Sequence, residues 1–223
     1  MPLKTKTVIM NAAEELFAAA GYNATSLRAI TQAADVNLAA VNYHFGGKQG
    51  LLEAIYNRRI APMNTARIDS LEKLEKTWLS SPIPLDDLVK SFIKPALSMS
   101  RNEDGKHFVT LLGRSYMEPN PILQEQVRSM FSEVSERFAT SFARTLPYLS
   151  RDELYCRMHF MVGVLAYCMS GADLMRMIAS SQFLDNASSE TLINNLVDFV
   201  CNGMAASGSN EESIEPSGIV SIA

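Results

Sequence analysis

Cysteine is scarce in this chain, and the patterns typical of enzymes and metal proteins are missing. The 223-residue chain contains only three cysteines, Cys156, Cys168 and Cys201, and they do not have the spacing of metal ligands. His107 and His159 stand alone, without a partner at ligand spacing. No glycine-rich phosphate loop, G-x-S-x-G or H-E-x-x-H motif is present. The sequence therefore predicts no catalytic residue, no metal and no cofactor.

Long apolar stretches are missing as well. No uninterrupted apolar run reaches the roughly 20 residues that a membrane span needs, and no signal peptide precedes Lys4. The odd number of cysteines fits a reducing compartment, in which we expect buried thiols rather than disulfides. The chain is therefore predicted to be a soluble, cytoplasmic protein without a membrane partner.

Alternation of apolar and polar residues, the pattern of a half-buried strand, is almost absent, whereas helical spacing recurs throughout. We predict an all-α protein with a three-helix head at residues 1–60, a helical body at residues 61–206 and a flexible tail at residues 207–223. A fourth helix joins the head to the body, and Pro62 is expected to interrupt it. Pro95 is expected to kink or end a later helix.

Basic residues are too few to make the whole chain cationic, since the net charge is −4. The charge is unevenly distributed, however. Residues 1–60 contain six Lys and Arg residues against four acids, a balance of +2 that leaves −6 for the remainder. A cationic head on an acidic body would direct DNA to one end of the molecule.

Two short helical patterns flank a tight turn in residues 27–45. The first apolar pattern ends near Ala34, and a second short helix is expected over Leu38–Tyr43. Asn37 is a suitable N-cap, because its side-chain oxygen accepts a hydrogen bond from a free backbone N–H of the first turn. Asp35, in the turn, tolerates a left-handed backbone better than most residues do. The pattern predicts a helix-turn-helix unit.

The second of these helices leaves an amide, a phenol and an imidazole exposed, which suits contact with DNA. An asparagine such as Asn42 pairs with the N6/N7 edge of adenine in the major groove, while Tyr43 and His44 hydrogen bond to phosphate oxygens. Lys48 adds a cation at the expected start of the next helix, whose N-terminus also attracts phosphate.

A dense set of residues in the first 60 positions matches one family pattern. It consists of Ala12–Phe17 (AAEELF), Gly21-Tyr22, Thr25-Ser26-Leu27 and Asn42–Lys48 (NYHFGGK). With these residues the chain resembles the TetR family of bacterial transcriptional regulators. The family usually has glycine in the turn where this chain has Asp35. The run Asn37–Phe45 is also similar to the fatty-acid-responsive PsrA group.

This resemblance implies a homodimeric repressor that binds two-fold-related operator DNA and that a small effector releases. The implied DNA contacts are Thr25, Asn37, Leu38, Ala39, Asn42, Tyr43, His44 and Lys48. The hydroxyl of Thr25 equally suits a cap of the first short helix. Two C-terminal helices, near residues 151–179 and 189–204, are expected to form a four-helix dimer interface that includes Val197 and Val200.

Twelve methionines favour an adaptable interior that binds an apolar, acyl-type effector. The candidate ligand residues are Arg114, Phe131, Met161 and Tyr167. Each has a plain structural alternative, which is core filling for the apolar residues and an ion pair with Glu118 for Arg114. The main alternative function is a helical sensor or interaction protein that no longer binds DNA, and a helical enzyme is a more distant one.

Overall fold

The structure of the chain is a computed structural model that describes residues 2–100, 105–117, 121–169 and 189–207. Every regular element in these ranges is an α-helix, which confirms the predicted all-α fold. The end of the predicted helix 151–179 and nearly all of the predicted tail lie outside the described residues.

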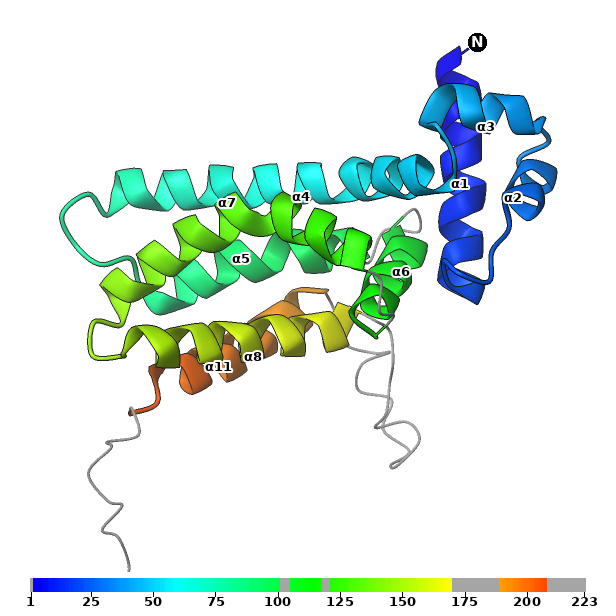
Figure 1. The fold of residues 1–223 in the computed structure, drawn as a ribbon. Helices are drawn as coiled ribbons and strands as arrows, with labels where there is room; N and C mark the ends of the chain where they lie inside the picture. The colour runs from blue at the N-terminus through cyan, green and yellow to red at the C-terminus, as the bar shows by residue number, and fades with distance from the viewer. Residues whose placement is uncertain (1, 101–104, 118–120, 170–188, 208–223) are drawn as a thin grey trace, which may run out of the picture.

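Three helices lie together at one end of the molecule and form the head (Figure 1). They are α1 (Pro2–Ala20), α2 (Leu27–Ala33) and α3 (Leu38–Phe45). One fully buried side chain from each helix, Phe17, Ile30 and Val41, meets in the core of the head. Gly21 ends α1 at φ +84°, and its N–H donates to the carbonyl of Phe17 at 2.9 Å. Glycine adopts this left-handed conformation without steric cost.

A single long helix, α4 (Lys48–Thr77), connects the head to the body. The expected interruption at Pro62 is wrong, because α4 runs through this residue for 30 residues without a break. Pro62 is exposed, whereas Ile60 and Met63 on either side are buried against the rest of the chain. Water can therefore hydrate the backbone carbonyl that the proline ring leaves free, while packing holds the flanking turns. Pro95 is likewise inside a helix and does not end it.

The body consists of five further helices in the described residues. They are α5 (Leu85–Ser100), α6 (Lys106–Met117), α7 (Pro121–Thr145), α8 (Arg151–Met169) and α11 (Ser189–Ala205). Figure 1 shows α4, α5 and α7 above α8 and α11, with α6 next to the head. The rings of Phe92 and Phe138 meet edge to face at 5.1 Å in the core, and α1 packs against both α4 and α6. The head therefore rests directly on the body.

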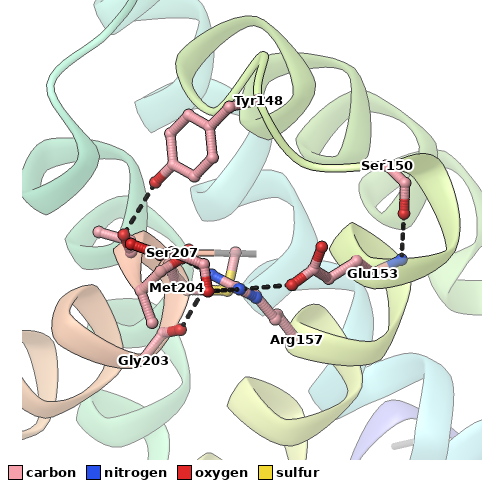
Figure 2. Close-up of polar contacts among 9 residues, drawn as sticks. Tyr148, Ser150, Glu153, Arg157, Gly203, Met204 and Ser207 are labelled. Carbon is pink, nitrogen blue, oxygen red and sulfur yellow. Dashed lines mark hydrogen bonds and ion pairs between the residues drawn. The ribbon is translucent and has the colours of Figure 1, made fainter. Parts of the chain in front are cut away.

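Arg157 ties α8 to the end of α11 (Figure 2). Its guanidinium donates to the backbone carbonyls of Met204 at 2.7 Å and Ala206 at 2.6 Å, and to the carboxylate of Glu153 at 2.6 Å. The hydroxyl of Tyr148 donates to the carbonyl of Ala205 at 2.9 Å. The last carbonyls of a helix have no partner within the helix, so these donors stabilise the end of α11.

The thiols differ from the expectation of burial, because Cys156 is exposed and Cys168 and Cys201 are only partly covered. They lie on α8 and α11, which also carry exposed aromatic side chains such as Phe160 and Phe199. Burial raises the pKa of Cys168 above its ordinary value. Burial, and then the carboxylates of Asp86 and Asp198, raise the pKa of Cys201 to about 11.

No helix in the described part of the chain is long and apolar enough to cross a membrane.

Candidate nucleic-acid interface

The first helix of the pair is capped by Ser26, whose side-chain oxygen accepts a hydrogen bond from the N–H of Ala29 at 3.1 Å. The expectation that Thr25 caps this helix is wrong. The hydroxyl of Thr25 points inward and donates to the carbonyls of Gly21 at 2.8 Å and Leu16 at 3.2 Å. Because only 4% of Thr25 is exposed, its hydroxyl holds the end of α1 against the start of α2. In this conformation the hydroxyl is unavailable to a phosphate.

The turn and the second helix have the predicted geometry. Asp35 has a φ of +50°, the only positive φ among the described non-glycine residues. The N–H of Val36 donates to the carbonyl of Thr31 at 3.0 Å and closes the turn. Asn37 caps α3 as predicted, since its Oδ1 accepts from the N–H of Ala40 at 2.9 Å. Local hydrogen bonds therefore fix where α3 begins and how it is oriented.

The outer face of α3 is polar and exposed. Tyr43 is 85% exposed, Leu38 is half exposed, and Ala39 and Asn42 are also exposed. The completely buried Val41 fixes the rotation of the helix, so these side chains point away from the core of the head. His44 is partly covered, with its ring 5.1 Å from that of Tyr43 in an edge-to-face arrangement.

Lys48 is the first residue of α4, directly after a glycine pair that ends α3. Gly46 has a φ of +70° and Gly47 a φ of +130°, so a side chain at either position would be strained. The ammonium of Lys48 lies 4.3 Å from the centre of the Tyr22 ring, which holds it beside the start of α4. Burial, and then the carboxylate of Glu53, raise the pKa of the Tyr22 hydroxyl. A cation and a helix N-terminus therefore lie at one place.

An ion-pair cluster that the sequence reasoning missed joins α1 of the head to the connecting helix α4. The carboxylate of Glu14 on α1, only 3% exposed, accepts from Arg58 at 2.5 Å and from Arg59 at 2.9 Å on α4. Arg58 also donates to the Oδ1 of Asn11 at 2.7 Å. The available signal was the acidic Glu14 in the buried stripe of an apolar helix, which requires a cationic partner.

The body contains an interior cavity of about 210 Å³ between α4, α5, α6, α7 and α8. Phe131, one of the predicted ligand residues, lines it together with Phe92 and Met169. Buried Arg67 also lines it, lying 4.0 Å over the Phe92 ring and donating to the Phe92 carbonyl at 2.9 Å.

Two of the other three predicted ligand residues, Met161 and Tyr167, are not among the described residues that line this cavity. Met161 lines a small hollow between α8 and α11 instead, and its role as a ligand residue stays a prediction. Tyr167 is 39% exposed, and its role as a ligand residue stays a prediction. The side chain of Arg114 lies outside the described residues. Helical spacing alone did not show which face of α8 is turned toward the cavity, because α8 carries apolar residues on all of its faces.

The fold and the site define a class of protein: an all-helical chain with a helix-turn-helix head, a polar outer face on the second helix of that unit, and a larger body with a cavity. Residues 9–55 match the family of bacterial regulatory proteins called tetR. Residues 90–203, just over half of the chain, match the tetracyclin repressor-like C-terminal domain. The chain therefore belongs to the TetR family.

Individual relatives share parts of this organisation. The probable HTH-type transcriptional regulator YttP of Bacillus subtilis (strain 168) is 45% identical over 53 residues. This match covers 24% of the chain and only 26% of YttP. The structure of NalD, the secondary repressor of the MexAB-OprM efflux pump in Pseudomonas aeruginosa, has a TM-score of 0.63 at 24% identity and covers 91% of this chain and 98% of NalD. The hemolysin II transcriptional regulator HlyIIR has a TM-score of 0.60 at 16% identity, covering 89% and 98%. At these identities the structural likeness concerns the fold.

Proposed function

We propose that this chain is a homodimeric, sequence-specific DNA-binding transcriptional regulator, and specifically a repressor that a small apolar effector releases from its operator. The observation that carries the proposal is the exposed polar face of α3, where Asn42 and Tyr43 point away from buried Val41. Side chains this exposed contribute little to the core of the head. A duplex supplies base edges and phosphates that match them.

The α3 residues take different roles in this proposal. Asn42 reads a base edge in the major groove, while Tyr43, His44 and Lys48 bind phosphates. Leu38 and Ala39, at the exposed start of α3, pack against bases or sugars. Asn37 contributes through its cap, which directs the start of α3 toward the groove. A phosphate contact was expected near Thr25. Because Thr25 is buried, we assign this contact to its exposed neighbour Ser26.

The dimer forms through the outer faces of α8 and α11. Phe160 on α8 is 63% exposed and Phe199 on α11 is 66% exposed. Both line one shallow hollow, so they belong to one apolar surface. Val197 and Val200 are buried within the protomer and are therefore core residues, contrary to the expectation that they lie at the interface. A two-fold dimer places two α3 helices on half-sites roughly 34–36 Å apart.

The effector occupies the interior cavity and acts through α4. Met63 and Arg67 of α4 line this cavity, and Lys48 begins the same unbroken helix beside α3. Fifteen helical residues span about 22 Å, so a small tilt at the cavity moves the head. An effector that prefers the tilted state by about 1–3 kcal/mol lowers operator affinity 5- to 150-fold.

The acyl nature of the effector is the finer part of the proposal. The similarity of Asn37–Phe45 to the PsrA group favours it, as does a cavity lined by Met63, Phe131 and Met169. The cavity volume of about 210 Å³ corresponds to roughly seven water volumes, which favours a short or medium-length chain. Titration of fatty acids and acyl-CoAs of graded length into the operator complex identifies the length that releases DNA. An unchanged operator affinity at every length would contradict an acyl effector.

The central test of function is selection of duplexes from a randomised pool by the full-length chain, followed by a gel shift with the DNA upstream of its own gene. We expect enrichment of a two-fold-related sequence and loss of its binding in Tyr43→Ala. A folded dimer that enriches no sequence would support the alternative, a helical sensor that no longer binds DNA.

A further inference from the structure

A second hollow, of about 800 Å³, lies between α4 and α5 and has no role in the proposed function. We call it the α4–α5 groove. Its apolar lining includes Pro62, Leu74, Pro95 and Met99. Met63 lines both this groove and the interior cavity, so one side chain lies between the two. The volume falls within the range of roughly 300–1,000 Å³ that is usual for ligand sites.

The charge of the α4–α5 groove is opposite to that of the body around it. Five cationic side chains line it, and Asp87 is the only acidic one. They are Arg58, Arg59, Lys73, Lys90 and Lys94. Glu14 pairs with the two arginines, and the three lysines still outnumber Asp87. These lysines belong to the chain beyond residue 60, which carries −6 overall. Positive charge concentrated in a hollow attracts an anion.

Several of these cations are available to a ligand. Within the described ranges, the side-chain ammonium groups of Lys73, Lys90 and Lys94 form no hydrogen bond or ion pair, and all three residues are exposed. At the end of the groove nearest the head, the Nε of Arg58 is buried and finds no hydrogen-bond acceptor among the described residues. A buried donor without an acceptor is uncommon in folded proteins.

We propose that the α4–α5 groove binds an amphiphilic anion, an apolar chain that carries one or more phosphate groups. The apolar chain covers Leu74, Pro95 and Met99, and the phosphate lies among the lysine and arginine side chains. A neutral apolar molecule would leave the cations unused, and a bare polyanion would leave the apolar lining exposed to water. Because the groove combines apolar and cationic lining residues, it favours a ligand that has an apolar chain and an anionic group.

Dodecyl phosphate is a suitable probe, and its binding to the full-length chain is measured by calorimetry. The single tryptophan of the chain, Trp78, follows the groove residue Thr77 at the end of α4 and gives a second readout by fluorescence. We expect one molecule per chain. Inorganic phosphate, which lacks the chain, and dodecyl maltoside, which lacks the charge, bind at least tenfold more weakly. Equal binding of either control would overturn the proposal.

Substitutions then locate the site. The double substitution Lys90→Ala and Lys94→Ala weakens dodecyl phosphate binding by about tenfold, because it removes two phosphate partners. Lys76→Ala, at an exposed lysine of α4 outside the groove, leaves it unchanged and serves as the matched control. Unchanged binding in the double variant would contradict the proposal.

A second pair of variants separates the groove from the interior cavity. Ala66→Trp places a large ring in the groove and abolishes binding, whereas Ala166→Leu reduces the interior cavity and leaves binding intact. The opposite pattern would place the ligand in the cavity and overturn the assignment. Because no DNA is used, this result does not depend on the proposed operator binding.

Discussion

The head and the body of this protein are stabilised in different ways. In the head, the defining contacts join residues three or four positions apart, such as Ser26 with Ala29, Asn37 with Ala40, and Gly46 with Asn42. In the body, the polar contacts that position the helices span long stretches of sequence. Arg157 reaches Met204, and the amide of Asn64 donates to the carbonyl of Met130 at 2.8 Å.

This difference assigns different tasks to the two regions. A head that is defined by local caps and a short turn keeps one shape, which suits the repeated recognition of one DNA sequence. A body whose helices meet through distant contacts, and which contains both a cavity and a groove, has surfaces that a ligand can rearrange. The comparison implies that changes in the body alter association and response, whereas changes in the head alter recognition.

The largest expected effect concerns the dimer surface of the body. Phe199→Asp removes an exposed aromatic side chain from each protomer of a two-fold interface and puts charges in its place. At about 2 kcal/mol for each hot-spot side chain, the two losses raise the dimer dissociation constant on the order of a thousandfold. Sedimentation should show folded monomers with an unchanged helical signal.

The control for this variant is Asn194→Asp, which adds the same charge at an exposed position of α11 roughly 140° around the helix. We expect the control to remain dimeric. Dimers of Phe199→Asp at micromolar concentration would show that α8 and α11 do not form the interface.

The ion pairs between α1 and the connecting helix α4 give the next largest effect. Glu14→Ala leaves Arg58 and Arg59 without their shared carboxylate, and removal of one partner from a buried pair costs about 3–5 kcal/mol. Both arginines are about one-fifth exposed, so we expect a loss near 3 kcal/mol in urea unfolding. Glu15→Ala, at the exposed neighbouring position, should stay within about 0.5 kcal/mol of the wild type. Equal stabilities of the two variants would contradict a stabilising role of the ion pairs of Glu14 with Arg58 and Arg59.

A smaller effect separates the role of Asn37 as the cap of α3 from its proposed role in DNA binding. Asn37→Ala loses the cap of α3 and should lower the free energy of unfolding by about 1 kcal/mol. Asn37→Asp keeps an oxygen that accepts from the N–H of Ala40 and should preserve stability, but its negative charge opposes DNA phosphates. Urea unfolding and gel shift together should therefore show full stability with weaker DNA binding in this variant. Normal DNA binding by Asn37→Asp would place Asn37 away from the phosphates.

The smallest effect concerns the rates at which the thiols of the body react, and it does not involve the free energy of unfolding. The pKa of Cys201 is raised to about 11, so its protonated form predominates at pH 8 and only about one thiol in a thousand is ionised there. In the monomeric Phe199→Asp variant, exposed Cys156 should react first with a thiol reagent, and the Cys201 rate should rise about tenfold per pH unit from pH 8 to 10. Labelling followed by peptide mass analysis gives each rate. Faster labelling of Cys201 than of Cys156 at pH 8 would contradict the described burial.

The head was predictable from sequence because its structure depends on nearby residues. The N-cap at Asn37, the left-handed turn at Asp35 and the start of α4 at Lys48 all follow from side-chain chemistry over a few positions. The error at Thr25 arose because adjacent Thr25 and Ser26 both suit a cap, and only the packing of α1 decides which hydroxyl turns inward.

The body was predictable in outline only. Helical spacing located α7 and α11 well, but it did not show that Phe131 and Met161 face different hollows. That distinction depends on which helices pack on each side of α8. Periodicity also could not show that Val200 is covered within the protomer while Phe199 is not, since both belong to the apolar residues of one helix. The helices continue past Pro62 and Pro95, because tertiary packing maintains a helix that local preference opposes.

The central claim, that α3 reads bases through Asn42 while its neighbours hold phosphates, is tested most directly by selection from a randomised duplex pool. Wild type, Asn42→Ala and Lys48→Ala are compared on the same pool at one salt concentration. We expect Asn42→Ala to lose about 1–3 kcal/mol of base discrimination at one position of each half-site. Lys48→Ala should bind every sequence more weakly without a change in preference. A changed preference in Lys48→Ala together with an unchanged one in Asn42→Ala would contradict the account.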